Sequence, residues 1–316
     1  PTADVMIGLS SDDTTEGTVS STPLTFTAAN WDVAQTVIVT GRDDDIVDGG
    51  IGFKILTAAA TGGDYGGIDA ADVDVTNTDD DTRGVTVSAI SGDTTEAGGT
   101  ATFTVVLDSE PTADVMIGLS SDDTTEGTVT ATPLTFTAAN WNVAQTVTVT
   151  GVNDDMDDGD IAFRIRTAAA TGGDYAGIDA ADVDVTNTDD DIRGVTVSAI
   201  SGNTTEAGGT ATFTVVLNSQ PTVDVMIGLS SDDTTEGTVT ATPLTFTVAN
   251  WNVAQTVTVT GVNDDVDDGD IAFKILTAAA TGGDYAGIDA ADVDVTNTDD
   301  DTRGITVSAI SGNTTE

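Results

Sequence analysis

The sequence predicts an all-β chain, a linear array of seven-stranded antiparallel β-sandwiches of Greek-key type. Val, Ile, Leu and Phe alternate with Thr over short segments, and no helical period occurs anywhere in the 316 residues. Turns rich in Gly, Pro, Asp and Ser separate these segments. A unit of 110 residues also repeats almost verbatim, which is the length of a domain and too long for a solenoid repeat.

The repeat sets the expected domain organisation. Residues 84–193 and 194–303 differ at only nine positions, so we predict two complete repeats there. Residues 1–83 match the later part of the same unit and form a partial repeat, from the third strand to the last, while 304–316 match its first strand. A partial sandwich exposes unpaired edges. We expect neighbouring sequence to complete it, either as the continuing chain of a longer array or as head-to-tail subunits that share strands.

The strands of the complete repeat follow from the alternation and the turns. Pro133 cannot donate a ladder hydrogen bond, so the strand that contains it is expected at a sheet edge or at a bend. In the middle repeat the predicted strands are 85–90, 100–107, 114–119, 128–137, 145–151, 161–168 and 182–188.

Strand direction places the acidic loops at one end of the sandwich. In an antiparallel order the loops 91–99, 120–127 and 152–160 all lie at the end of the sandwich where the last strand also finishes. Segment 154–160 alone holds five aspartates, which repel one another at neutral pH unless a cation lies among them. A solvated acidic loop is the competing interpretation. The residues expected to converge in the middle repeat are Glu96, Asp122, Asp123, Asp154, Asp155, Asp157, Asp158, Asp189, Asp190 and Asp191.

Composition narrows the partners and the metal. The chain has 54 acidic against 8 basic residues and a net charge of −46, so a folded state needs screening or bound cations. The charge argues against nucleic acid and anionic membranes as partners, and no apolar run is long enough to span a membrane. His and Cys are absent, which argues against zinc, copper and iron–sulfur centres. Hard carboxylate oxygens suit Ca²⁺ best, at about two to four ions per complete junction.

These motifs together resemble the Calx-beta domain. Glu96-Ala-Gly-Gly precedes a Thr-x-Phe-x-Val segment, Asn153-Asp-Asp-x-Asp-Asp precedes Ile161-Ala-Phe, and Asp189-Asp-Asp ends the last strand. The near-verbatim copies are similar to tandem repeats of giant bacterial surface and adhesin-like proteins. The resemblance covers the whole chain and implies an immunoglobulin-like sandwich.

The resemblance also implies a ligand set for Ca²⁺ at one end of each domain. In the middle repeat it comprises Glu96, one of Asp122 and Asp123, the acidic loop and the terminal aspartates. In the first copy Val47 stands where the middle repeat has Asp157. The equivalent residues elsewhere are Asp12, Asp13, Asp44, Asp45, Asp48, Asp79, Asp80, Asp81, Glu206, Asp232, Asp233, Asp264, Asp265, Asp267, Asp268, Asp299, Asp300 and Asp301.

Two other features are weighed against this metal site. Trp31, Trp141 and Trp251 suggest either a sugar-binding stripe or, as we favour, plugs over the sandwich end. Asp174 and Asp179 are candidates for a weak second cation site. Paired aspartates also perform acid–base catalysis in some enzymes. Here ten crowd together without His, Lys or a defined cleft, so we expect no enzyme.

The sequence therefore predicts a structural function. We expect a Ca²⁺-rigidified spacer of a secreted or surface-displayed bacterial protein, an adhesin stalk or extracellular filament whose partners are its own neighbouring repeats. A regulatory Ca²⁺ sensor, as in the exchanger members of the family, and a carbohydrate-binding repeat are the alternatives. Affinity separates the first two: about 10⁻⁴–10⁻³ M is typical of extracellular modules and about 10⁻⁷–10⁻⁵ M of sensors.

Overall fold

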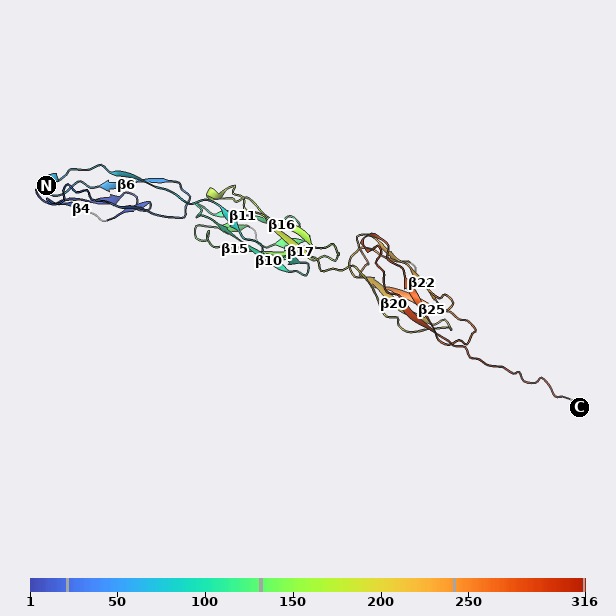
Figure 1. The fold of residues 1–316 in the computed structure, drawn as a ribbon. Coiled ribbons are helices and arrows are strands. Elements are labelled where there is room, and N and C mark those ends of the chain that lie inside the picture. The colour runs from blue at the N-terminus through green and yellow to red at the C-terminus, as the bar shows by residue number, and fades with distance from the viewer. Residues whose placement is uncertain (21–22, 131–132, 241–242, 315) are drawn as a thin grey trace. The chain divides into compact units, whose positions relative to one another are not determined.

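The computed structural model describes residues 1–20, 23–130, 133–240, 243–314 and 316. The expected all-β fold is confirmed, because its described regular elements are β-strands joined by turns and three short 3₁₀ helices. Figure 1 shows the strands in chain order from the N-terminus to the C-terminus. The chain divides into two compact units. Unit 1 holds residues 1–94, 99–150 and 162–185, and unit 2 holds residues 95–98, 151–161 and 186–316.

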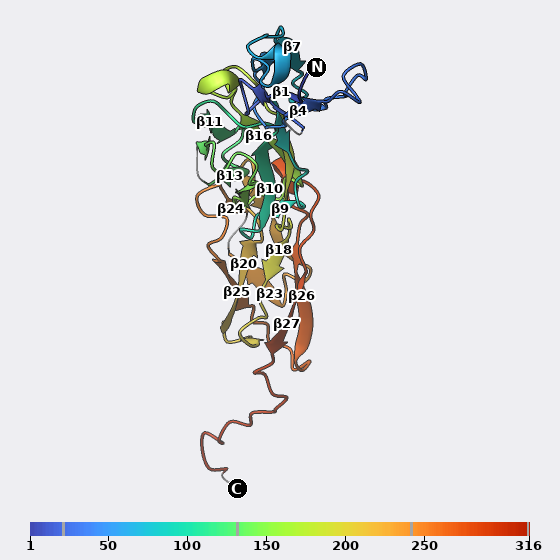
Figure 2. The ribbon, with the colours of Figure 1, turned by 90° about the vertical axis from the view of Figure 1, so that its left-hand side faces the viewer.

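In unit 2 the last repeat is a sandwich of two four-stranded sheets (Figure 2). The first sheet has the order β18-β20-β25-β23, and β20 pairs antiparallel with β25 over six residues, from Thr210 opposite Thr260 to Val215 opposite Gln255. The strands are β18 (Val195–Val197), β20 (Thr210–Leu217), β23 (Gly237–Val239) and β25 (Gln255–Gly261).

The second sheet of this sandwich has the order β19-β27-β26-β22. Its short edge strand β19 runs parallel to β27, whereas β26 pairs antiparallel with both β27 and β22. A separate antiparallel pair, β21 with β24, completes the repeat. The strands are β19 (Thr204–Thr205), β21 (Val225–Ile227), β22 (Leu229–Ser231), β24 (Leu244–Phe246), β26 (Ile271–Thr277) and β27 (Val293–Thr298).

The core of this sandwich follows from the period-two alternation. In β20 every second side chain is buried, and Phe213 and Val215 pack with Phe246, Phe273 and Tyr285 from other strands and turns. The alternate, more exposed positions of β20 are Thr210, Thr212, Thr214 and Val216. Alternation along the chain therefore decides which face of each strand is inside.

A close approach explains one glycine at the start of β23. A Cβ on Gly237 would lie 2.2 Å from Cζ of Phe273, and 2.5 Å from a second atom of the same ring. The Phe273 ring packs on the bare backbone there. A larger residue at this position would force the ring out of the core.

The middle copy has the same strands, and most of their residues lie in unit 1. β10 (Thr100–Leu107) pairs with β15 (Gln145–Gly151) and with β8 (Val85–Val87). β11 pairs with β14, and β12 with β16. The remaining strands of this copy are β9 (Thr94–Thr95), β11 (Val115–Ile117), β12 (Leu119–Ser121), β13 (Gly127–Val129), β14 (Leu134–Phe136), β16 (Ile161–Thr167) and β17 (Val183–Thr188).

Residues 1–83, also in unit 1, form three small sheets with a reduced core of Leu9, Phe53 and Ile55. Tyr65 is 42% exposed, whereas its equivalents Tyr175 and Tyr285 are fully buried. The strands, in sheets β1-β4, β2-β6-β7 and β3-β5, are β1 (Val5–Ile7), β2 (Leu9–Ser11), β3 (Gly17–Val19), β4 (Leu24–Phe26), β5 (Val39–Gly41), β6 (Ile51–Thr57) and β7 (Val73–Asn77).

The strand predictions hold in outline, with several differences. The expected strand 85–90 is shortened to β8 (Val85–Val87), and the short strand β9 lies within the expected loop 91–99. The expected strand 114–119 is split at Gly118, because β11 and β12 pair with different partners. Of the expected strand 128–137, residues 131–132 lie outside the described residues, and the rest forms β13 and β14. Residues 304–314 belong to no strand. The short 3₁₀ helices η1 (Gly63–Tyr65), η2 (Gly173–Tyr175) and η3 (Gly283–Tyr285) were not predicted.

None of the helices among the described residues is long and apolar enough to cross a membrane.

Candidate metal centre

In unit 2, strand pairing brings one group of three carboxylates together. Glu206 follows β19, while Asp300 and Asp301 follow β27, the parallel partner of β19. The Glu206 amide donates to the carbonyl oxygen of Thr298 over 3.1 Å, which continues the pairing by one residue. One carboxylate oxygen of each acidic residue then lies within 4.8 Å of the others. Residues nearly a hundred positions apart thus meet because their strands pair.

Burial leaves this group electrostatically strained. Glu206 is only 2% exposed, and its Oε2, like Oδ2 of Asp301, is buried without a hydrogen-bond partner among the described residues. Burial, followed by the charges of nearby aspartates such as Asp299, raises the pKa of Glu206. Buried polar atoms are nearly always paired, and an unpaired charge is costly. A cation between the three carboxylates would give the unpaired oxygens a partner and would balance their negative charge.

The equivalent group before it, Glu96 with Asp190 and Asp191, also lies in unit 2 and has the same features. Glu96 is 2% exposed and its Oε2 has no partner among the described residues. Burial raises the pKa of Glu96 to about 7, with further contributions from the charges of Asp154, Asp189 and Asp158. The acidic loop and the aspartates that follow β17 therefore both lie near this glutamate, as the strand directions predict.

A second kind of group uses a glutamate that the sequence analysis overlooked. Within unit 2, Glu236, next to β23, meets Asp264 and Asp268 from the loop between β25 and β26. Glu236 is 7% exposed, and its carbonyl accepts from the amide of Val262 over 2.9 Å, which fixes it beside that loop.

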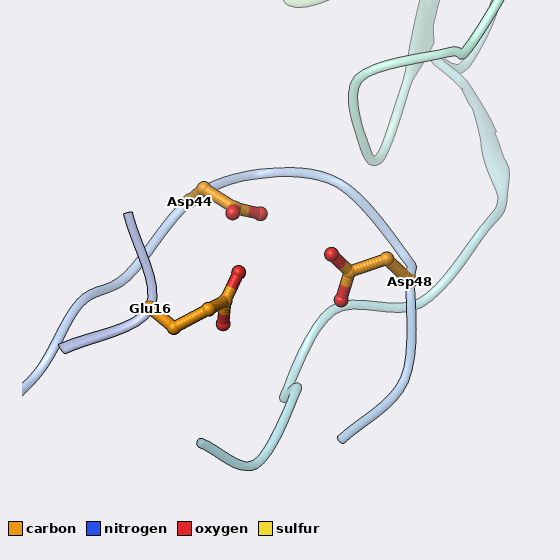
Figure 3. A group of neighbouring side chains, drawn as sticks. All are labelled: Glu16, Asp44 and Asp48. Carbon is orange, nitrogen blue, oxygen red and sulfur yellow. The ribbon is translucent and has the colours of Figure 1, made fainter. Parts of the chain in front are cut away.

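Unit 1 carries the same arrangement in Glu16, Asp44 and Asp48 (Figure 3). Figure 3 shows their carboxylates pointing toward a common space from two separate segments, with Asp44 and Asp48 on one loop and Glu16 on the other. Carboxylate oxygens of the three residues lie within 4.8 Å of one another. Val47 lies in the same loop but contributes no carboxylate, so the change from Asp at this position does not alter the group.

Asp299 supports the loop rather than joining either group. Its Oδ2 accepts from the amide of Gly269 over 2.8 Å, and its Oδ1 accepts from the amide of Asp301 over 2.8 Å. These backbone hydrogen bonds, from Asp301 and then Gly269, lower the pKa of Asp299. The side chain thereby holds the acidic loop against the end of β27.

The aspartates that precede the overlooked glutamate accept hydrogen bonds from other residues. Asp233 Oδ1 accepts from the hydroxyl and the amide of Thr235, and these bonds lower its pKa. Asp232 Oδ1 accepts from the amide of Lys274 over 2.6 Å. Neither belongs to a group of three. The same holds for their equivalents in unit 1, where Asp123 accepts from Thr125 and Asp122 from Arg164.

Asp157 is engaged by an arginine. Its Oδ2 accepts from the amide of Arg193 over 2.7 Å and lies 3.1 Å from Nε of the same residue. The Arg193 hydrogen bonds lower the pKa of Asp157. This aspartate therefore closes the loop onto the segment that leaves the domain.

The predicted residues thus divide by placement within the two units. Those in a group of three that lies within one unit are Asp44, Asp48, Glu96, Asp190, Asp191, Glu206, Asp264, Asp268, Asp300 and Asp301. Asp154 and Asp158 lie close enough to Glu96 to raise its pKa. The groups do not include Asp12, Asp13, Asp45, Asp79, Asp80, Asp81, Asp122, Asp123, Asp155, Asp157, Asp189, Asp232, Asp233, Asp265, Asp267 or Asp299.

Comparison with known proteins gives distant structural similarity. No family model matches the chain, and no curated protein matches it. Among solved structures it is similar to CBD12 from CALX1.2, at 16% identity and a TM-score of 0.30, covering 62% of this chain and 79% of that one. It is also similar to the surface layer protein SbsC, domains 4-9, at 16% identity and a TM-score of 0.26, covering 93% of this chain and 39% of that one.

Proposed function

We propose that this chain is a spacer of repeated β-sandwiches stiffened by Ca²⁺, part of a secreted or surface-displayed bacterial protein. One observation carries the proposal: carboxylates converge in groups of three around a glutamate, which is buried in the groups of Glu96, Glu206 and Glu236. Three of the carboxylate oxygens in these groups lack hydrogen-bond partners among the described residues. All the ligands are hard oxygens, which is the donor set that Ca²⁺ prefers. The role is structural, and the groups serve as cation cages rather than as catalytic acids and bases.

Each group would hold one cation. In the last repeat, Glu206, Asp300 and Asp301 would hold one ion, and Glu236, Asp264 and Asp268 a second. Three carboxylates per ion leave coordination positions for backbone carbonyls and water, since Ca²⁺ takes about six to eight oxygens. Because the ion binds the folded group and not the dispersed carboxylates of the unfolded chain, it stabilises the fold.

The loop that carries these ligands also meets the following repeat. In unit 1 the carbonyl oxygen of Asp45, between the ligands Asp44 and Asp48, accepts from the amide of Glu110 over 2.7 Å. In unit 2 the carbonyl oxygen of Asp155 accepts from the amide of Gln220 over 2.6 Å. A cation that orders the loop therefore orders the acceptor on which the next repeat docks. This is how Ca²⁺ would stiffen a junction.

Calorimetric titration of the full chain with Ca²⁺ after chelator treatment tests the proposal. We expect saturable binding with dissociation constants of about 10⁻⁴–10⁻³ M, the range of extracellular modules. Small-angle scattering of the same samples should show a narrower range of chain dimensions in Ca²⁺ than in chelator. Asp264→Asn with Asp268→Asn should remove one ion, while Asp108→Asn, an exposed position where the next repeat has Asn218, should remove none.

Two outcomes would count against the spacer. Absence of Ca²⁺ binding up to 10 mM, about ten times the weakest of those constants, would refute the metal centre itself. Binding at about 10⁻⁷–10⁻⁵ M without any change in scattering would instead favour the sensor.

A further inference from the structure

Each repeat ends in an arginine just after its terminal aspartates: Arg83, Arg193 and Arg303. In unit 1, Arg83 Nε donates to Oδ2 of Asp174 over 2.7 Å. Its guanidinium also donates to the carbonyl oxygen of Val47 in the acidic loop. Asp174 belongs to η2 of the next repeat, so one side chain connects the acidic loop of 1–83 with the repeat that follows.

Hydrogen bonds from Thr112 orient the Asp174 carboxylate for this contact. Asp174 Oδ1 accepts from the amide of Thr112 over 3.0 Å and from its hydroxyl over 2.9 Å, which leaves Oδ2 for Arg83. The Asp174 side chain is only 15% exposed. Burial would raise the pKa of Asp174, but the hydrogen bonds from Arg83 and Thr112 outweigh it and lower the pKa to about 2.

The equivalent aspartate in the last repeat is oriented in the same way. Asp284 Oδ1 accepts from the amide of Thr222 over 3.1 Å and from its hydroxyl over 2.8 Å. These bonds again overcome burial and lower the pKa of Asp284. The receiving turn is therefore a feature of the repeat and not of one junction.

The two arginines use this turn differently, and one substitution explains why. Arg193 Nη2 donates to Oδ1 of Asp157, and its Nη1 reaches only the backbone carbonyl of Asp284, at 3.5 Å. Arg83 has no such carboxylate on its own loop, because Val47 occupies the position of Asp157. Its guanidinium is therefore available for the Asp174 carboxylate.

We infer that the terminal arginine and the aspartate of the following 3₁₀ turn form a charge clasp between consecutive repeats, and that the residue at position 47 or 157 sets its strength. With valine at this position the arginine pairs with the aspartate of the next repeat. With aspartate there, the arginine pairs instead with that aspartate on its own loop. The clasp needs no cation, so it acts beside the proposed Ca²⁺ centre and stands independently of it. Its partner is another copy of the same repeat.

Because the chain contains no cysteine, thiol-reactive spin labels attach only at cysteines that are introduced, and distances between chosen positions can be measured. Spin labels on Ala71→Cys with Ala181→Cys report on the first junction, and on Ala181→Cys with Ala291→Cys on the second; all three positions are exposed and equivalent. Distance distributions are recorded by double electron–electron resonance in chelator. In the parent chain the first junction should give the narrower distribution.

Exchanging the residues at positions 47 and 157 should exchange the widths of the two distance distributions. Val47→Asp should broaden the first distribution and lower its docked population by about fivefold, the upper range for a partly exposed ion pair. Asp157→Val should narrow the second. Asp174→Asn keeps an acceptor for Thr112 but removes the charge, so it should match Val47→Asp, and 1 M salt should do the same. Asp108→Asn should change neither junction.

The clasp is refuted if Val47→Asp and Asp157→Val leave both distributions unchanged while intrinsic fluorescence shows folded chains. It is also refuted if 1 M salt and Asp174→Asn have no effect on the first junction. Adding Ca²⁺ to the parent chain tests the cation centre separately, so failure of one proposal does not conceal failure of the other.

Discussion

Replacing two of the buried glutamates, Glu96 and Glu206, tests the electrostatic reasoning most directly. Glu96→Gln combined with Glu206→Gln keeps the shape of both side chains and removes their charge. In chelator the variant should be more stable than the parent chain, which is unusual for a change at a buried polar residue. In saturating Ca²⁺ the order should reverse, because each ion loses a charged ligand.

The magnitude follows from the pKa of Glu96. Burial raises it from 4.5 to about 7, so the folded state binds a proton more tightly than the unfolded state by about 2.5 pKa units. At about 1.4 kcal/mol per unit, the ionised carboxylate costs the metal-free fold about 3.5 kcal/mol at pH 8. Removing that cost should raise the melting temperature of the repeat by about 14 °C, since a domain of this size shifts about 4 °C per kcal/mol.

Differential scanning calorimetry of the full chain at pH 8, with chelator and with 5 mM Ca²⁺ (a concentration above the weak affinities typical of extracellular modules, about 10⁻³ M), gives both comparisons. Asp108→Asn provides the control, because it makes the same kind of charge change at an exposed position where the next repeat already has Asn218. If the glutamine variant melts lower than the parent chain in chelator, the ionised glutamates are not strained. If Ca²⁺ raises its melting temperature as much as in the parent chain, they are not ligands.

Two further expectations follow from the same structure. The metal-free chain should be most stable near pH 5 and should lose stability as the pH rises through about 7. The reason is that the Glu96 carboxyl keeps its proton up to about pH 7 in the folded state but releases it near pH 4.5 in the unfolded state. Thermal melts in chelator from pH 5 to 8 measure this change, and a rise in stability over that range would contradict it. Tyr285→Phe should lower the stability of the last repeat by about 1–3 kcal/mol, because the buried hydroxyl donates to the carbonyl of Ser219 and accepts from its amide. Tyr65→Phe, at an exposed equivalent, should leave the denaturation midpoint unchanged.

The sequence was sufficient for the fold because the alternation of apolar residues with Thr is nearly unbroken in the long strands. Predicted strands 100–107 and 145–151 coincide with β10 and β15. The prediction was less accurate where pairing partners change within a segment. On either side of Gly118 the chain pairs first with β14 and then with β16, and no local pattern reveals a change of partner.

The site was predicted in outline for the same reason. Strand direction alone placed Glu206 and Asp301 at one end, and the parallel pairing of β19 with β27 brings them together. Which acidic residue of the preceding loop joins a group depended on side-chain competition instead. Asp233 is occupied by the hydroxyl and amide of Thr235, two residues on, whereas Glu236 lies beyond that turn and meets Asp264.

That competition leaves a readable signal in the motif Asp-Asp-Thr-Thr-Glu, which occurs before the strand in every copy. An aspartate followed two residues later by threonine tends to satisfy its own loop, because its short side chain reaches the local amide and hydroxyl. The glutamate after them has a longer side chain that extends beyond the turn, and in the last copy its Oε2 accepts from the side-chain amide of Asn297 over 3.4 Å. In a crowded acidic loop, the residue available to a cation is therefore the one that the local turn does not use. Asp157 follows the same rule, since its position beside Arg193 gives it a partner before any cation is bound.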